Sequence, residues 1–182
     1  MIERLDYDGK PCIIGYHTQE FRYTGTLDNP IVCKTKDAWL GIGFYFWVDL
    51  EFAHYWGEDF KKDTTGYYDI YIGFIEEDKL WNTVFSEDGY NFFYKIVNET
   101  IEQIHSLNRK LTLQEVHRLL KEKFWEPMGI SGIIYDDTPN NPKGKNRVLS
   151  EIHPLYYKKR IQIVVFERTK IHNFDIHLEE QC

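Results

Sequence analysis

The amino-acid sequence predicts an α+β fold, with strands at both ends of the chain and helices grouped between them. Segments with strand periodicity come first and last, and two long helical stripes lie in the middle, whereas a repeating βαβ array would alternate them. The 182 residues are enough to bury one substantial core. Since no internal repeat or low-complexity linker interrupts the chain, we expect residues 1–182 to form a single domain.

The first part of the chain predicts two strands followed by a helix. Residues 13–17 have the composition of a short strand, and residues 43–48 are almost wholly apolar and aromatic, as is typical of a central strand. Asp49 then stands where a helix N-cap belongs. The apolar residues after it recur at helical spacing: Phe52, Ala53, Trp56 and Phe60. They predict an amphipathic helix over residues 50–61.

The middle of the chain predicts a strand over residues 67–75, a helix over residues 91–107 and a further strand over residues 132–135. Between the last two, Thr112 and Glu115 have the spacing of a capping box, which opens a second helix. We expect the core face of that helix to carry four apolar residues: Leu113, Val116, Leu120 and Phe124.

The end of the chain begins with its most loop-like segment, residues 136–160, where prolines, asparagines and a glycine come close together. Two strands follow over residues 161–166 and 171–176. A turn at residues 167–170 joins them.

Composition narrows the class of protein. A net charge of −7 argues against binding nucleic acid through the overall field. The acidic N-terminus has no apolar run, so we expect no secretory signal, and no stretch approaches the ~20 apolar residues that span a bilayer. Three widely spaced cysteines suit reduced thiols in the cytoplasm: Cys12, Cys33 and Cys182. No histidines pair at metal-ligand spacing, so we expect no metal site.

Three segments stand out for their chemistry. Residues 15–18 read GYHT and place a histidine at the end of a strand. Residues 37–47 read DAWLGIGFYFW and lead into the predicted helix with its Ala53 and Trp56. Residues 161–166 read IQIVVF and follow the long loop.

In this order the segments resemble the ADP-ribosyltransferases of the diphtheria-toxin and poly(ADP-ribose) polymerase branch. They look most similar to small bacterial toxin or phage-defence members that carry a Trp-Leu-Gly-x-Gly-x-Tyr-Phe-Trp motif. The resemblance covers residues 13–57 and 161–171. It implies a split β-sandwich with helices on its flanks and NAD+ bound as co-substrate in the cleft between the sheets. It also implies a mono-ADP-ribosyltransferase that modifies RNA, DNA or protein in the cytoplasm, with a cognate antitoxin as a partner.

The resemblance assigns roles to six residues that would bind NAD+: Tyr16, His17, Thr18, Gly43, Phe44 and Tyr45. His17 would hydrogen-bond the adenosine ribose, and the backbone beside it would hold the nicotinamide carboxamide. Tyr45 would stack on nicotinamide, whose positive ring an aromatic face attracts by ~1–2 kcal/mol when desolvated. Many members carry Gly where this chain has Thr18, but a backbone contact tolerates that change.

Gln162 departs from the family pattern, because many members have Glu at the start of the last core strand. Either Gln162 binds the nicotinamide ribose and another acid serves, or catalysis is reduced or lost. Glu151 in the preceding loop is the first reserve among the acids, ahead of Asp136 and Asp137. Glu167 has odd spacing from Gln162, so on a regular strand it faces the opposite side.

Other interpretations stay open. A Tyr–His pair on a strand is, by itself, more often a buried core histidine than a ligand-binding one. One functional alternative is a non-catalytic module that binds NAD+, ADP-ribose or a partner protein, and another is an NAD+ glycohydrolase that uses water as acceptor. Basic residues in the long loop favour an anionic acceptor such as RNA or DNA, with acidic protein as the rival: Lys143, Lys145 and Arg147.

Overall fold

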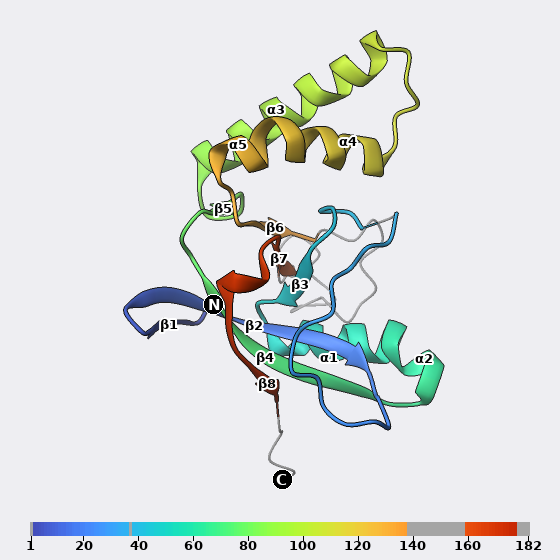
Figure 1. The fold of residues 1–182 in the computed structure, drawn as a ribbon, viewed down its shortest axis with the longest axis vertical. Coiled ribbons are helices and arrows are strands. Elements are labelled where there is room, and N and C mark those ends of the chain that lie inside the picture. The colour runs from blue at the N-terminus through green and yellow to red at the C-terminus, as the bar shows by residue number, and fades with distance from the viewer. Residues whose placement is uncertain (1, 37, 138–158, 178–182) are drawn as a thin grey trace, which may run out of the picture.

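The computed structural model describes residues 2–36, 38–137 and 159–177, and every strand in it joins one mixed eight-stranded sheet (Figure 1). The sheet order is β5-β6-β7-β3-β2-β4-β8, and β1 pairs with β2. The strands are β1 (Arg4–Tyr7), β2 (Lys10–Glu20), β3 (Phe44–Trp47), β4 (Tyr68–Glu76), β5 (Leu80–Asn82), β6 (Gly132–Asp136), β7 (Ile161–Val165) and β8 (Ile171–Ile176). Strands β5 and β6 run parallel, and the other neighbours run antiparallel.

The helical segments fall into two groups. The first is α1 (Leu50–Trp56), which continues through a π-helical turn (Gly57–Lys61) into α2 (Lys62–Thr65). The second contains α3 (Glu87–Ser106), α4 (Leu113–Leu120), a π-helical turn (Lys121–Trp125) and α5 (Glu126–Met128). A short 3₁₀ turn (Arg168–Lys170) separates β7 from β8. Among the described residues, no helix is long and apolar enough to cross a bilayer.

The sheet is nearly divided between β3 and β2, which share one residue pair, Tyr16 and Trp47. We call β5, β6, β7 and β3 the first half-sheet, and β2, β4, β8 and β1 the second half-sheet. One core cluster draws buried residues from both: Phe46, Ile134, Ile161, Ile163 and Val165 from the first, and Ile13, Ile75 and Ile171 from the second. The two half-sheets therefore fold face to face over a shared apolar layer.

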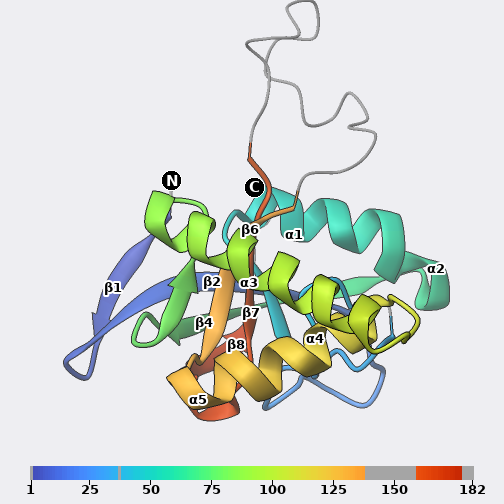
Figure 2. The same cartoon turned by 90° about the horizontal axis from the view of Figure 1, so that it is seen from above.

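Helices cover the outer faces of the two half-sheets. Helices α3 and α4 lie side by side and pack on the first half-sheet, where Ile96 and Leu120 join Val164 in a second core cluster (Figure 2). Helix α1 packs on the second half-sheet, with Ala53 against Ile70. The central strands near these helices are thus covered on both faces, whereas β1 and β8 each keep exposed polar residues on one face.

Most predicted elements are confirmed, with shifts at their ends. The helix expected over residues 50–61 continues to Thr65. Helix α3 begins at Glu87, before the predicted residue 91, because the Ser86 hydroxyl caps it by accepting from the Gly89 N–H at 3.0 Å. Strand β2 is longer than the predicted residues 13–17 at both ends.

The predicted face of α4 is partly wrong. Leu113 is 48% exposed, whereas Leu119 is buried together with Val116 and Leu120. The buried stripe of α4 is therefore rotated toward Leu119. Phe124 is partly buried against the same cluster.

The capping box at the start of α4 is half formed. The Thr112 hydroxyl accepts from the Glu115 N–H at 3.2 Å, as predicted. The Glu115 carboxylate does not close the box, because Arg109 and Arg118 donate to it instead. The arginine pairs replace the second capping bond at a solvent-exposed helix end.

Candidate functional site

The three residues expected at the site lie on three neighbouring strands: His17 on β2, Tyr45 on β3 and Gln162 on β7 (Figure 1). The β3–β7 register places Tyr45 and Gln162 on the same face of the sheet. His17 points to the other face, because its neighbour Tyr16 pairs with Trp47 on the Gln162 face. The fold brings the three positions together, but their side chains do not all point one way.

His17 fills the gap between β2 and β3, and it is 6% exposed rather than at the mouth of a cleft. Its Nδ1 donates to the Tyr45 carbonyl at 2.8 Å, and its Nε2 accepts from the Ile31 N–H at 3.4 Å. A carbonyl can only accept, so the proton lies on Nδ1. Burial lowers the pKa of His17 to about 4, which keeps the ring neutral with Nε2 as an acceptor.

Backbone groups of Thr18 point toward β3. The Ile14 N–H donates to the Glu3 carbonyl beside β1, which lies along the same edge of β2 as β3. Alternate residues of a strand direct their backbone groups to the same edge, so those of Thr18 face this edge too. Among the described residues β3 offers Thr18 no pairing, since the two strands share one residue pair.

The imidazole of His17 explains why the strands part at this point. If pairing continued beyond Tyr16 and Trp47, Tyr45 would stand opposite Thr18. The Tyr45 carbonyl instead accepts from His17. A side chain has taken the place of a ladder bond, so the backbone of Thr18, which is buried at 5% exposure, has no strand partner on this edge among the described residues.

The side chain of Thr18 is buried and ties the open edge to α1. Its hydroxyl donates to the Ala53 carbonyl at 2.8 Å. Ala53 belongs to the helix motif recognised in the sequence, so this bond links two of the motif's segments. The helix thereby fixes the strand edge without using the backbone groups of Thr18.

Tyr45 has a structural role in the turn that precedes β3. Its hydroxyl donates to the Gly41 carbonyl at 2.7 Å and accepts from the Leu40 N–H at 3.0 Å. Gly41 has a φ of 87°, and a Cβ there would come within 3.2 Å of the His117 ring. Burial raises the pKa of Tyr45, so the hydroxyl stays protonated. Stacking of its half-buried ring on nicotinamide stays a prediction.

Gly43 and Phe44 are explained by packing. A Cβ on Gly43 would lie 2.5 Å from a methyl group of Val164 and 2.8 Å from the Val165 carbonyl, so only glycine lets β3 approach β7 this closely. Phe44 packs against the layer between the half-sheets. Neither residue needs a ligand to account for its presence.

Gln162 is buried and oriented by Trp39. The Trp39 Nε1 donates to the Gln162 Oε1 at 2.9 Å. Because an indole N–H is only a donor, this bond fixes the amide with its Nε2 directed elsewhere. That nitrogen has no hydrogen-bond partner among the described residues, so it can donate to a ligand. Gln162 shares its face with Val164.

Sequence reasoning missed the roles of Trp39 and His117. The His117 Nε2 donates to the Trp39 carbonyl at 2.7 Å, and this bond attaches the turn that contains Gly41 and Gly43 to α4. Burial lowers the pKa of His117 and keeps it neutral. The indole of Trp39 meets Tyr135 edge-on, with ring centroids 5.1 Å apart. The position of His117 beside buried Val116 was the available signal.

An ion pair lies beside Gln162. The Arg160 Nη2 is 2.8 Å from the Asp137 Oδ2, and the guanidinium lies over the Trp47 ring, 5.2 Å from its centroid. Burial raises the pKa of the Asp137 carboxyl, although Arg160 opposes this shift. The neighbouring Asp136 lies 3.9 Å from the Lys159 ammonium.

Several predicted residues lie outside the described part of the chain: Glu151, Lys143, Lys145, Arg147 and Cys182. Cys12 and Cys33 are free thiols. Glu167 follows the end of β7, so the strand does not define its face. Within the described ranges, no cluster of three histidine, cysteine or acidic residues could hold a metal ion.

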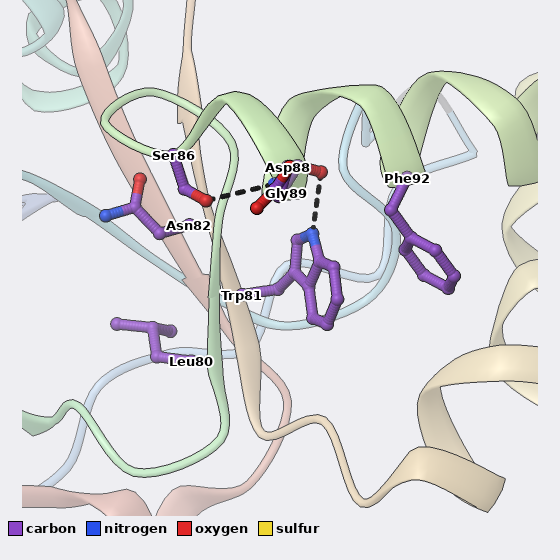
Figure 3. Close-up of a pocket in the computed structure, with 7 residues that line it drawn as sticks. All are labelled: Leu80, Trp81, Asn82, Ser86, Asp88, Gly89 and Phe92. Atoms are coloured by element: carbon purple, nitrogen blue, oxygen red, sulfur yellow. Dashed lines mark hydrogen bonds between the residues drawn. The ribbon is translucent and has the colours of Figure 1, made fainter.

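A separate hollow of about 380 Å³ lies at the first turn of α3 (Figure 3). Some of its polar groups bond to one another: the Trp81 Nε1 donates to the Gly89 carbonyl, and the Ser86 hydroxyl accepts from the Gly89 N–H. The hollow adjoins β5 at the far edge of the sheet from β2. It is lined by Leu80, Trp81, Asn82, Ser86, Asp88, Gly89 and Phe92.

Comparison of the chain with protein-family models, with curated proteins and with solved structures finds no match.

Proposed function

We propose that this protein is an NAD+-dependent mono-ADP-ribosyltransferase that modifies a macromolecule. The observation that carries the proposal is the parting of β2 and β3 at His17, which leaves the backbone of Thr18 open beside Tyr45 and Gln162. A primary carboxamide carries an NH2 group and a carbonyl oxygen, so one of its N–H donors and its acceptor can pair with a peptide group. The nicotinamide amide of NAD+ can therefore pair with Thr18 as an additional strand would.

The architecture supports this proposal. Two half-sheets packed face to face, with helices on their outer faces, fit the split β-sandwich that the sequence motifs imply. The near-division of the sheet falls between the strands that carry His17 and Tyr45. Residues that are distant in the sequence thus lie on neighbouring strands, which supports a shared site.

The state of the His17 ring suits a sugar ligand. Its Nε2 is an acceptor, and its bond from the Ile31 N–H is long at 3.4 Å. A ribose hydroxyl can donate to that nitrogen and replace the weak backbone contact. The Gln162 Nε2 supplies a donor for a second ribose hydroxyl.

The chemistry would be displacement at the ribose carbon that bears nicotinamide. Departure of nicotinamide leaves an oxocarbenium-like ribose, as in glycoside hydrolysis. The acceptor would be RNA, DNA or protein. We further propose that the protein acts in the cytoplasm as a toxin or defence effector restrained by a cognate antitoxin.

A second function is favoured by one observation. Gln162 is neutral and its oxygen is held by Trp39, so this position supplies no charge to a cationic transition state. A binding module for NAD+ or ADP-ribose would need none. An NAD+ glycohydrolase would differ from the transferase in taking water as acceptor.

One experiment separates these functions. The protein is incubated with a cell lysate and NAD+ labelled in its adenylate part, while nicotinamide release and the melting temperature are followed. Label in nucleic acid or protein supports the transferase, and label in free ADP-ribose alone supports the glycohydrolase. A thermal shift without nicotinamide release supports the binding module. The absence of both binding and turnover contradicts the proposal.

A further inference from the structure

The amino-terminal end of β7 brings two charged side chains to the face that carries Gln162. Gln162 pairs with Tyr135 of β6. The Asp137 N–H donates to the Arg160 carbonyl at 2.7 Å, which extends the β6–β7 ladder beyond both strands. Since alternate residues share a face, Asp137, Arg160 and Gln162 lie on the same side of the sheet.

Arg160 holds the Asp137 carboxylate in place. The guanidinium is fixed between Asp137, at 2.8 Å, and the rings of Trp47 and Phe52, whose centroids lie at 5.2 and 5.8 Å. The bond uses the Oδ2 of Asp137. Its Oδ1 has no hydrogen-bond partner in the described ranges, so one carboxylate oxygen is free to accept a proton.

Asp137 and Gln162 are diagonal neighbours across the β6–β7 pair. Diagonal neighbours across an antiparallel pair lie roughly 7–8 Å apart. In inverting glycoside hydrolases, two carboxyl groups about 6.5–9.5 Å apart leave room for a nucleophilic water between them. A ribose held by the Gln162 amide would therefore have space for an acceptor on the side of Asp137.

We infer that Asp137 is the general base of the reaction and that Arg160 is its positioning residue. This inference rests on the proposed function and names the acid that Gln162 cannot supply. Asp136 is one residue away, but it pairs with Ile161 and faces the opposite side of the sheet.

The step conserves atoms and charge. The acceptor's nucleophilic atom bonds to the ribose carbon as the bond from that carbon to nicotinamide breaks. The electrons of the broken bond neutralise the pyridinium nitrogen, and nicotinamide leaves as a neutral molecule. The proton of the nucleophile passes to the Asp137 carboxylate and then to solvent.

The test compares Asp137→Asn with Asp136→Asn in the full chain, using labelled NAD+ and lysate. Loss of a general base should lower label transfer and nicotinamide release by about 100-fold or more in Asp137→Asn. The NAD+-induced thermal shift should persist, because the base does not hold NAD+. Asp136→Asn should react near the wild-type rate.

A structural role for the ion pair makes a different prediction, which Arg160→Gln tests. That variant breaks the same pair but keeps the carboxylate, and Asp137→Glu keeps both charges. If Asp137 acts as the base, Asp137→Asn should lower kcat far more than either variant. Equal losses in Asp137→Asn and Arg160→Gln would mean that the pair serves only the fold, and would overturn the inference.

The remaining outcomes separate this inference from the proposed function. A wild-type protein that does not turn over NAD+ contradicts both. A wild-type protein that is active while Asp137→Asn is equally active contradicts the inference alone. The inference alone is also contradicted if Asp49→Asn, at the start of α1, abolishes activity while Asp137→Asn does not.

Discussion

The two edges of β2 differ in how they are paired. Along one edge β2 pairs with β4 without interruption from Cys12 to Glu20. Along the other it meets β1 near its start and β3 at Tyr16. The edge paired with β4 builds the second half-sheet, whereas the edge toward β3 leaves peptide groups of β2 without a strand partner. One buried imidazole thus occupies the carbonyl that the next ladder bond would use, and the strand edge beyond it is unpaired among the described residues.

The paired side of the molecule should control stability, and Glu76 of β4 offers the largest effect. Its carboxylate accepts from Lys10, Lys170 and His172. We expect Glu76→Gln to lower the free energy of unfolding by about 2–3 kcal/mol, because it leaves charged partners uncompensated. The NAD+-induced thermal shift should be unchanged. If Glu76→Gln lost NAD+ binding but kept its stability, the β4 edge would serve binding, contrary to this division between the two edges of β2.

The same carboxylate predicts a pH dependence. Burial would raise the pKa of Glu76, but hydrogen bonds from Lys10, Lys170 and His172 outweigh it and hold the pKa at about 2, below the ordinary 4.5. Because its pKa is lowered in the folded state, the ionised Glu76 carboxylate stabilises the fold at pH values above 4.5. That stability is lost as the pH falls from 4.5 towards 2. Denaturant unfolding across this range should show a steeper loss in the wild type than in Glu76→Gln.

The open edge should control binding, and His17→Asn tests it. The Asn amide can still donate to the Tyr45 carbonyl, whereas the acceptor at Nε2 is lost. NAD+ affinity should fall by about 1–3 kcal/mol, as measured by calorimetry, because a ribose hydroxyl loses its partner. In the control His17→Phe the Tyr45 carbonyl is also left unpaired, so its unfolding free energy should fall as well. NAD+ binding to His17→Asn at wild-type strength would identify His17 as a core residue.

A smaller effect is expected from Trp39→Phe, which frees the Gln162 amide while keeping an aromatic ring against Tyr135. The lost hydrogen bond is worth about 0.5–1.5 kcal/mol, so KM for NAD+ should rise roughly two- to tenfold. Trp81→Phe is the matched control, because it removes a similar bond to Gly89 in the hollow of Figure 3. If both variants change KM equally, the amide orientation of Gln162 has no part in binding.

The sequence predicted elements whose signals are local. Strand β8 over residues 171–176 was found with its bounds, and Asp49 holds the N-cap position of α1 as expected. Strand β1 was missed because Arg4–Tyr7 is short and half polar. Its turn was visible as Asp8-Gly9, where both residues have a positive φ, which is typical of a two-residue hairpin.

The site could be predicted only in part, because its geometry depends on register. The resemblance places the motif residues around one cleft, but the opposite facing of His17 and Tyr45 depends on where β2 and β3 stop pairing. Asp137 ranked behind Glu151 because its partner Arg160 lies 23 residues further along the chain. Nothing local to residue 137 indicates that contact.

The single residue pair between β2 and β3 also has a mechanical consequence. Tyr16 and Trp47 are the point at which the backbone hydrogen bonding of one half-sheet passes to the other. A carboxamide that pairs with Thr18 would add a backbone hydrogen bond next to the Tyr16–Trp47 pair. The Thr18 amide proton would then exchange with deuterium more slowly. Protection should then spread from Thr18 into β3 when NAD+ is added, while β4 and β8, already paired, exchange at an unchanged rate. The bound ligand would then hydrogen-bond to the edge of β2 as an additional strand does.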